Sequence, residues 1–312
     1  GLAEMANLGL PVPPGFTISA KLCLRYLKDG SFPPALRQEI QQHLKQLEQA
    51  TERKLGDPVR PLLVSVRSGS AVSMPGMMET ILNLGLSDDT VQGLITGSGN
   101  PRFAYDSYRR FVQMYGDVVF DLGKAPFDEV LNELKHRRKA ARDIDLPAED
   151  LQALVREYKA IVQARSGVPF PDDPQAQLWG AIEAVFKSWR TRRAIDYRRV
   201  HGIPDDLGTA VNIMAMVYGN MGEDCGTGVA FTRDCRTGER VLNGDYLTNA
   251  QGEDVVSGAR TPESIAKLKR GRFAKIYRDL AAVAEKLEQH FHDVQYIEFT
   301  FKHGKLYLLQ TQ

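Results

Sequence analysis

Cysteine is scarce in this 312-residue sequence, which contains three, at Cys23, Cys225 and Cys235. The number is odd and the spacing is wide, whereas a disulfide framework or a zinc site would need an even set or Cys-X-X-Cys pairs. We therefore expect three free thiols in a reducing compartment. A disulfide between Cys225 and Cys235 across a hairpin is the alternative.

A surplus of one charge is also missing, because 40 Lys and Arg residues face 39 Asp and Glu residues. A net charge of +1 provides no basic field, so we expect no nucleic-acid partner. No hydrophobic run approaches the roughly 18 residues of a membrane span, and Gly1–Pro14 contains no basic segment of a signal peptide. We expect a soluble, cytoplasmic protein with no membrane partner.

The common signatures of nucleotide-binding and catalytic sites are absent as well. The sequence has no GxxxxGK[ST], no GxGxxG after a predicted strand and no protein-kinase catalytic motif. It has neither the GxSxG nor the HExxH pattern of hydrolases. Any nucleotide site must therefore be found from other features.

Alternation of strand-like and helix-like segments predicts a mixed α/β (α+β) fold in three parts. Residues 1–87 form a first α/β lobe, with strands at 14–18 and 62–66 and a helix at 34–55. Residues 88–201 form a helical subdomain, with helices at 103–120, 127–141, 148–163 and 175–200. Residues 202–312 form a second α/β lobe, with strands at 210–218 and 228–232, a helix at 261–291 and a hairpin of 296–300 with 305–309.

Three features can carry chemistry, although each also has a purely structural explanation. Gly219–Gly228 is a glycine-rich loop whose backbone N–H groups can bind phosphate or whose glycines can simply form a tight hairpin. Arg67–Met78 begins with an arginine at the end of a buried strand, which can bind phosphate or make a surface salt bridge. Glu298 and Gln310 lie on the strands of the last hairpin, where their oxygens can bind Mg²⁺ or form a hydrogen bond on the strand face.

Long segments of the sequence resemble the nucleotide-binding domain of the pyruvate, phosphate dikinase family. They are Val66–Gly85, Gly219–Arg233, Asn249–Val256 and Ile297–Thr311. The resemblance covers the whole chain, and these segments are far more specific than a glycine pattern. The related pyruvate, water dikinases continue differently after their Arg-Ser, without the stretch Ser73–Met78, which favours the phosphate-using family.

The resemblance implies an ATP-grasp fold in which Mg²⁺-ATP lies between two α/β lobes. It implies a phosphotransferase that binds ATP and phosphate and donates the β-phosphoryl group, as pyrophosphoryl, to a histidine on a separate phosphohistidine domain. A pyruvate/phosphoenolpyruvate barrel domain of the same full-length enzyme, which is expected to be a homodimer, completes the reaction. None of the six histidines matches the family's Thr-X-X-His-Ala context, so we expect one domain of a larger enzyme that is inactive alone.

The resemblance also assigns phosphate and metal contacts. Arg67 matches the phosphate-contacting arginine, with a catalytic role, and Gly76 matches a glycine of the flexible loop over the phosphates. Glu298 and Gln310 match the pair that holds the metal, which is Mg²⁺ in this family. These assignments agree with phosphoryl transfer, which depends on positioning and charge neutralisation.

A second set of matches concerns the rest of the nucleotide. Thr227 and Gly228 match the tip of the glycine loop. Met216 falls on the strand whose main chain contacts adenine, and Glu253 lies in the region near the nucleoside.

The sequence departs from the family at three places. The family's Gly-Gly-Lys-Gly segment would lie before Gly1, Tyr296 stands where the family has Asp, and Gln312 stands where it has Arg. Each difference removes a charge from the phosphate pocket, so we expect weak nucleotide binding. Two alternatives stay open: the same domain of a phosphoenolpyruvate synthase, and a degenerate ATP-grasp module that binds a partner without nucleotide.

Overall fold

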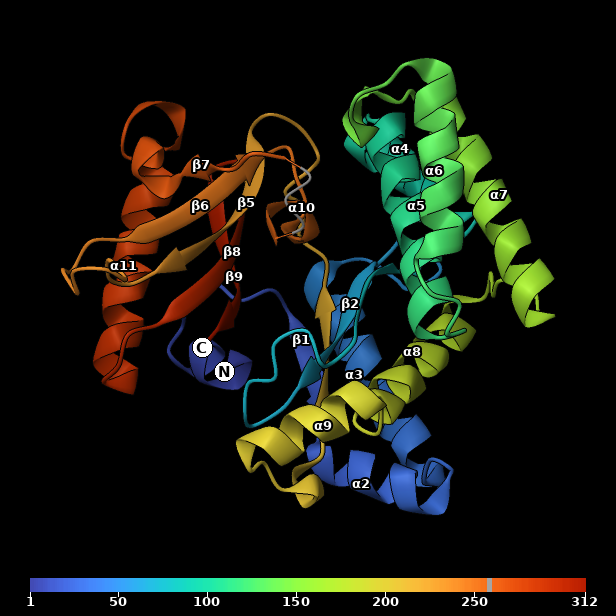
Figure 1. The fold of residues 1–312 in the computed structure, drawn as a ribbon, viewed down its shortest axis with the longest axis horizontal. Helices are drawn as coiled ribbons and strands as arrows, with labels where there is room; N and C mark the ends of the chain where they lie inside the picture. The colour runs from blue at the N-terminus through green and yellow to red at the C-terminus, as the bar shows by residue number, and fades with distance from the viewer. Residues whose placement is uncertain (257–259) are drawn as a thin grey trace. The chain divides into compact units, whose positions relative to one another are not determined.

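Two antiparallel sheets and the helices packed on them make up the computed structural model, which describes residues 1–256 and 260–312 (Figure 1). The chain divides into two compact units. We call Pro14–Met216 the central unit, and Gly1–Pro13 together with Val217–Gln312 the terminal unit. The presence of helices and sheets in both units confirms the predicted mixed α/β class.

The sheet of the central unit has the strand order β1 (Gly15–Ile18), β4 (Ala210–Ala215), β2 (Val64–Gly69) and β3 (Thr80–Leu84). All neighbouring strands are antiparallel. β4 follows the helices in the sequence but lies between β1 and β2, where Ile213 is paired with both Phe16 and Val66. The sequence predicted boundaries after residues 87 and 201, but the compact units divide after Pro13 and after Met216. The reason is that β4 ties both ends of the helical segment into one sheet. An independent helical subdomain stays a prediction.

Eight α-helices described in the structure belong to the central unit, and each has at least two buried residues. They are α2 (Ala20–Asp29), α3 (Pro34–Thr51), α4 (Thr90–Ser98), α5 (Pro101–Val118), α6 (Ala125–Arg138), α7 (Ala148–Ser166), α8 (Pro174–Ser188) and α9 (Arg192–His201). α8 packs on the sheet, and α7 packs against both α5 and α6 (Figure 1). Phe111, Phe127 and Tyr158 are fully buried in this helical layer.

The single helix predicted at 175–200 is wrong in one respect, because the structure has two helices there, α8 and α9, with a corner between them. The hydroxyl groups at the corner bond to nearby carbonyls: Ser188 to Val185 O at 2.7 Å and Thr191 to Ser188 O at 2.9 Å. Such local bonds compete with the helical ladder. The Trp189 indole N–H, in turn, donates to Asp205 O at 2.9 Å, which fixes the corner.

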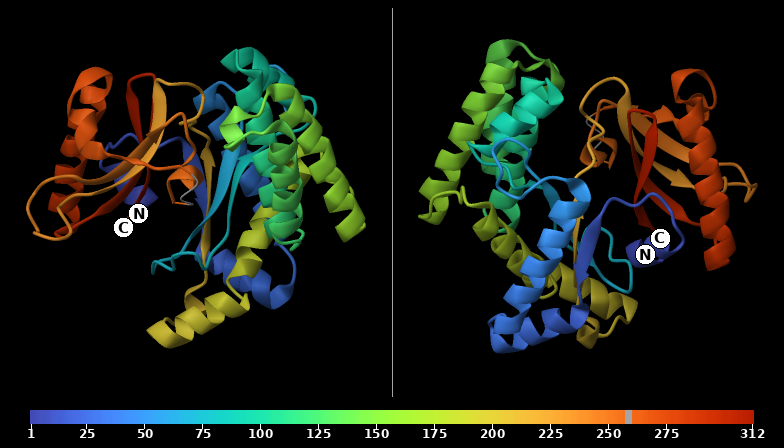
Figure 2. Two further views of the ribbon diagram at one scale, coloured as in Figure 1. Left: turned by 45° about the horizontal axis from the view of Figure 1, so that its top comes forward. Right: turned by 180° about the vertical axis from the view of Figure 1, so that it is seen from behind.

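The sheet of the terminal unit has the order β7 (Glu263–Ser264), β6 (Asn243–Thr248), β5 (Cys225–Phe231), β8 (Tyr296–Lys302) and β9 (Lys305–Thr311), again all antiparallel. The unit also contains α1 (Leu2–Asn7), α10 (Gly252–Val256) and α11 (Ala274–Phe291). α11 lies along one face of the sheet (Figure 2). Its buried residues Ile276, Leu280 and Leu287 share a core with Phe299 and Phe301 of β8.

The predicted helix at 261–291 begins only at Ala274. Gly271 has a φ of 79°, a left-handed conformation that interrupts a helix. The segment before it forms the short strand β7 and two single-turn helices, Ile265–Lys269 and Gly271–Phe273. Within the described residues, every helix is too short or too polar to cross a lipid bilayer.

Candidate functional site

The β8–β9 hairpin pairs Glu298 with Gln310 as the sequence predicted. The two residues are register partners, and both are half-buried. The register shifts between Glu298 and Phe299, so that Phe299 pairs with Leu308 and a β-bulge follows directly. Bulges locally redirect side chains and are frequent beside functional sites. A carboxylate and an amide oxygen are thus placed across one strand pair.

Strand alternation puts Glu298 on the face of the sheet away from α11. Ile297 and Phe299 belong to the core shared with α11, and successive side chains point to opposite faces. Val229 of β5 is the register partner of Glu298, and Thr227 is the partner of Thr300. We call this side of the sheet the polar face.

Thr227 and Gly228 lie inside β5, so their predicted place at the tip of a glycine loop is wrong. Thr227 is buried, and its hydroxyl donates to Phe299 O at 3.0 Å. A Cβ at Gly228 would lie 2.5 Å from Asp245 O and 2.7 Å from the Phe299 ring. Glycine is therefore needed here to make room for neighbouring groups. A contact of either residue with nucleotide stays a prediction.

The loop that precedes β5 is Gly219–Asp224, and it is tied to the segment after β6. Ala250 N–H donates to Gly219 O at 2.9 Å, and Asn249 N–H donates to Cys225 O at 2.9 Å. A Cβ at Gly219 would lie 2.5 Å from Ala250 O, so this glycine permits the close approach. Beyond this point, Glu253 is a half-buried residue of α10.

The phosphate candidates Arg67 and Gly76 belong to the central unit. Arg67 is half-buried on β2 and is the register partner of Thr80 and Asn212. Gly76 lies in the exposed loop between β2 and β3 with a φ of 69°, and a Cβ there would meet no atom within 4 Å. Its left-handed backbone, and not crowding, is what favours glycine at this position.

Met216 lies one residue beyond β4, where its N–H donates to Leu63 O at 2.9 Å. Its backbone is therefore held by the central sheet at the end of β4, and a main-chain contact with adenine stays a prediction. Arg67, Gly76 and Met216 are in the central unit, and the remaining candidates are in the terminal unit. That the two sets meet at one nucleotide stays a prediction.

Tyr296 and Gln312, at which the sequence analysis expects departures from the family, are paired with each other through their backbones. Tyr296 N–H donates to Gln312 O at 2.8 Å, and Gln312 N–H donates to Tyr296 O at 3.0 Å. The Tyr296 ring packs on Phe231 with a centroid distance of 5.1 Å. Burial raises the pKa of the Tyr296 phenol, and the Glu298 carboxylate raises it further. A neutral phenol therefore stands beside Glu298 at the polar face.

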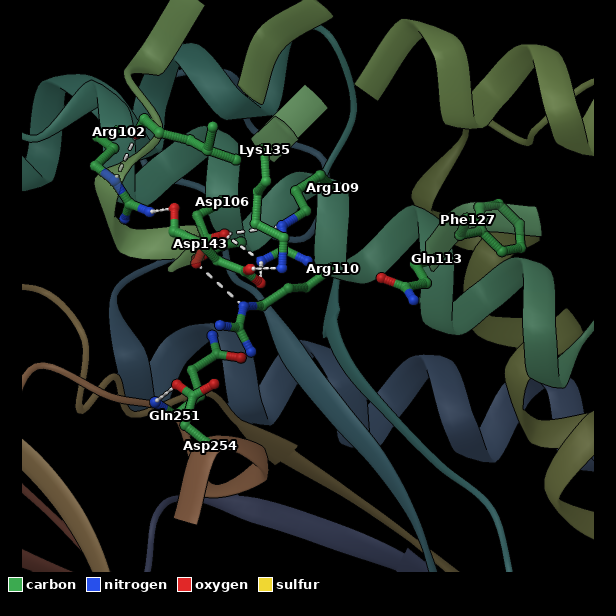
Figure 3. Close-up of polar contacts among 12 residues, drawn as sticks. Arg102, Asp106, Arg109, Arg110, Gln113, Phe127, Lys135, Asp143, Gln251 and Asp254 are labelled. Carbon is green, nitrogen blue, oxygen red and sulfur yellow. Dashed lines mark hydrogen bonds and ion pairs between the residues drawn. The ribbon is translucent and has the colours of Figure 1, made fainter. Parts of the chain in front are cut away.

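Sequence reasoning missed a buried cluster of ion pairs centred on α5 (Figure 3). Arg109 lies 2.8 Å from Asp106 and 3.0 Å from Asp143, and Arg110 lies 3.1 Å from Asp106. Lys135 of α6 lies 3.0 Å from Asp143. The spacing of Asp106, Arg109 and Arg110, three and four residues apart on one helix, is the signal that predicts such pairs.

The charges in this cluster depend on one another. Burial by itself would raise the pKa of Asp106, but Arg109 and Arg110 outweigh it and hold the pKa well below its usual range. The same balance of burial against Arg109 and Lys135 lowers the pKa of Asp143. The cluster is thus an ionised network that fixes α5 to α6 and to the turn at Asp143.

A second group that sequence reasoning missed is Asp224, Cys225 and His303 in the terminal unit. Asp224 and His303 are 79 residues apart in the sequence, so no local spacing rule could have found them. All three cysteines are free thiols, as predicted.

Comparison with known proteins gives one family and a consistent set of relatives. The family model described as pyruvate phosphate dikinase, AMP/ATP-binding domain, matches residues 25–278. Pyruvate, phosphate dikinase of Clostridium symbiosum is 51% identical over 316 residues, and that of Rhizobium meliloti (strain 1021) is 50% identical over 323 residues. The enzyme of Giardia intestinalis is 47% identical over 315 residues. Each alignment covers 100% of this chain but only 36% of the relative, so the chain spans about a third of their length.

Proposed function

The chain belongs to the pyruvate, phosphate dikinase AMP/ATP-binding domain family, and from this premise we propose that it binds Mg²⁺-ATP for phosphoryl transfer. The fold is of the ATP-grasp type. The observation that carries the proposal further is the pairing of Glu298 with Gln310 on the polar face of the terminal sheet. Both the chain's family and this pair of oxygen donors point to a metal-bound nucleotide.

Glu298 and Gln310 fit Mg²⁺ because this ion prefers hard oxygen ligands and keeps several positions for water and phosphate. One carboxylate and one amide oxygen leave most of an octahedral shell for those ligands. When bound, the ion neutralises charge on the phosphate chain.

Arg67 is proposed to bind the phosphate chain through its guanidinium group, which can donate two parallel hydrogen bonds to phosphate oxygens. Gly76 is proposed to let its loop approach the phosphates. Its left-handed backbone would be strained with a side chain, and backbone N–H groups in such turns can bind anions. The main chain of Met216 is proposed to contact adenine. Thr227, Gly228 and Glu253 are proposed to lie along the rest of the nucleotide.

The reaction proposed for the full-length enzyme follows from the family. A histidine nitrogen of a separate phosphohistidine domain attacks the β-phosphorus of ATP, and the bond to the α-phosphate breaks, which releases AMP. Phosphate then accepts one phosphoryl group as pyrophosphate, and the other passes to pyruvate on a barrel domain. The role proposed for this chain is to position ATP and stabilise the charge that moves.

The test is calorimetric titration with ATP in the presence and absence of Mg²⁺. Glu298→Gln keeps the shape of the side chain but removes the anionic ligand, so we expect Mg²⁺-dependent affinity to fall by about tenfold or more. Glu285→Gln is the matched control, because Glu285 is an exposed residue of α11, which covers the opposite face of the sheet. Unchanged Mg²⁺-ATP affinity in Glu298→Gln would dismiss the metal assignment.

A second candidate function is a binding module that has lost its nucleotide. The features in its favour are Tyr296 and Gln312, which stand where the family has charged residues, so that the proposed phosphate pocket lacks two charges. The same titration separates the two candidates. Absence of any ATP-dependent heat in the unmodified chain, at millimolar nucleotide, would favour the module.

A further inference from the structure

Asp224, Cys225 and His303 bring three different metal-ligating groups to one end of the terminal sheet. A carboxylate oxygen, the thiol sulfur and a ring nitrogen all lie within 4.8 Å of one another. His303 Nδ1 is 2.5 Å from Asp224 Oδ2, and Cys225 Sγ is 3.5 Å from Asp224 Oδ1. None of the three is used by the proposed nucleotide site.

The backbone holds these side chains together without a metal. Cys225 begins β5 and is the register partner of Lys302, the last residue of β8. Cys225 N–H donates to Gly222 O at 3.1 Å, which fixes Asp224 in a turn immediately before the strand. The position of both residues is therefore set by the sheet.

His303 occupies the two-residue turn between β8 and β9. Its φ is 48° and that of Gly304 is 75°, so both turn residues are left-handed, as in a type I′ hairpin. This turn usually takes Asn-Gly or Asp-Gly, and histidine is among the few other residues that tolerate a left-handed backbone. A rigid turn thus carries the imidazole to the start of β5.

The donor set selects the type of ion. Thiolate and imidazole together suit Zn²⁺, which binds Cys, His and carboxylate ligands in a tetrahedral shell. Mg²⁺ and Ca²⁺ prefer oxygen ligands alone. In a tetrahedral zinc site neighbouring ligand atoms are about 3.5 Å apart, so the observed separations need only small rotations. The Asp224 and His303 side chains are each 57% exposed and have the freedom to make them.

We propose that Asp224, Cys225 and His303 form a three-ligand zinc site that fastens the Gly219–Asp224 loop to the β8–β9 turn. The Cys225 thiol is fully buried and would bind the ion from the protein side. Asp224 and His303 are exposed, so the fourth ligand position would be open to water. On binding, the Cys225 S–H bond breaks, an S–Zn bond forms and the proton passes to solvent. No group is oxidised or reduced.

The first experiment titrates the nucleotide-free 312-residue chain, without a histidine tag, with Co²⁺ as a spectroscopic substitute for Zn²⁺. We expect one equivalent to produce a near-ultraviolet thiolate-to-cobalt absorption and the visible bands of a four-coordinate ion. Added Zn²⁺ should displace Co²⁺ and remove both signals. Failure of the unmodified chain to give the thiolate band would overturn the proposal and leave an Asp224–His303 hydrogen bond only.

Variants assign the ligands. Cys225→Ser should abolish the thiolate band, whereas Cys235→Ser, which alters the exposed cysteine of the same unit, should retain it. His303→Asn changes an exposed turn residue to one that the left-handed backbone favours, so it keeps the test decisive if Cys225→Ser fails to fold. Loss of an outer-shell partner typically lowers metal affinity about 10- to 100-fold, and we expect a larger fall in zinc affinity here because a ligand is lost. A thiolate band in Cys225→Ser, or unchanged zinc affinity in His303→Asn, would contradict the site.

Discussion

Glycine inside a strand lowers its stability, and it is often found where a neighbouring group approaches the backbone closely. In β5, Gly226 and Gly228 alternate with Cys225 and Thr227, so both glycines face the core. A Cβ at Gly226 would lie 2.3 Å from the Phe301 ring, and one at Gly228 would lie 2.7 Å from the Phe299 ring. The aromatic rings fill the room that two side chains would take, which explains the glycines without a ligand.

We therefore predict that Gly228→Ala destabilises the terminal unit by about 1–3 kcal/mol, the usual cost of overpacking a core. Urea-induced unfolding followed by circular dichroism measures the change. Gly252→Ala is the control, because a Cβ there would lie 3.9 Å from its nearest neighbour, Thr227 Oγ1, an ordinary contact. Equal stability of the two variants would show that the Phe299 ring can move aside and that packing does not explain Gly228.

Individual residues were predictable to different degrees. Glu298 and Gln310 could be paired from the sequence because a two-residue turn fixes the register of a hairpin. Thr227 was placed in a loop because its strand pairing with Thr300 is a long-range contact that no local pattern encodes. The contact between His303 and Asp224 could not be predicted for the same reason, because the two residues are 79 positions apart in the sequence.

At the scale of elements, α5 (Pro101–Val118) carries an amphipathic pattern that was read correctly and a charge pattern that was overlooked. Asp106 and Arg109 are buried although both are charged, with side chains only 6% and 4% exposed. Buried ion pairs contribute little net stability, but removing one partner leaves an uncompensated charge. The network therefore specifies how α5, α6 and the Asp143 turn fit together.

We predict that Asp106→Asn lowers the free energy of unfolding by about 3–5 kcal/mol at neutral pH, since Arg109 and Arg110 lose their shared carboxylate. Chemical denaturation measures it. Asp29→Asn is the control, because Asp29 is in an exposed pair with Arg25, which is worth about 1 kcal/mol or less. A loss in Asp106→Asn no larger than that of the control would show that the network is solvated.

The pH dependence has a definite sign. The folded-state pKa of Asp106 is depressed, so its contribution is fully present above the unfolded pKa of about 3.9 and is lost as the pH falls below that value. The unmodified chain should therefore lose stability more steeply than Asp106→Asn below about pH 4. Unfolding curves at about pH 6 and about pH 3 test this, and parallel losses in both proteins would exclude the depressed pKa.

Predicted helix boundaries are wrong where tertiary contacts outweigh the periodicity of apolar residues. The apolar pattern at 175–200 continues through Trp189, yet α8 ends at Ser188 because hydroxyl groups and the Trp189 indole bond elsewhere. The strand at Ala210–Ala215 was recognised as a strand, but its place between β1 and β2 was not. Pairing across nearly the whole central unit cannot be read from a local window.

For the whole molecule, we predict that this chain alone releases no AMP from ATP above background, because no histidine in it matches the family's nucleophile. Adding the separately expressed phosphohistidine domain of the parent enzyme should restore slow AMP formation, limited by the lost effective concentration of the tether. Thin-layer separation of radiolabelled ATP and AMP measures it. Robust AMP release by the chain alone would mean that it holds its own nucleophile, and the domain assignment would be abandoned.

In that two-component assay, Arg67→Ala should reduce AMP formation by about 10²–10³-fold, the usual effect of removing one donor to a transferring group. Arg53→Ala is the control, since Arg53 is an exposed residue of the same unit. Equal rates in the two variants would remove Arg67 from the proposed phosphate site.

The division of the chain has a consequence for its synthesis. The central unit is one continuous stretch, complete once β4 has been made, so it can fold while the ribosome is still translating. The terminal unit needs both Gly1–Pro13 and Val217–Gln312: Met5 is fully buried in the core that contains Leu280, and Pro11 O accepts a hydrogen bond from Leu308 N–H at 2.8 Å. Gly1–Pro13 therefore has to wait, unpaired, until β9 emerges, although it precedes the whole central unit in the sequence.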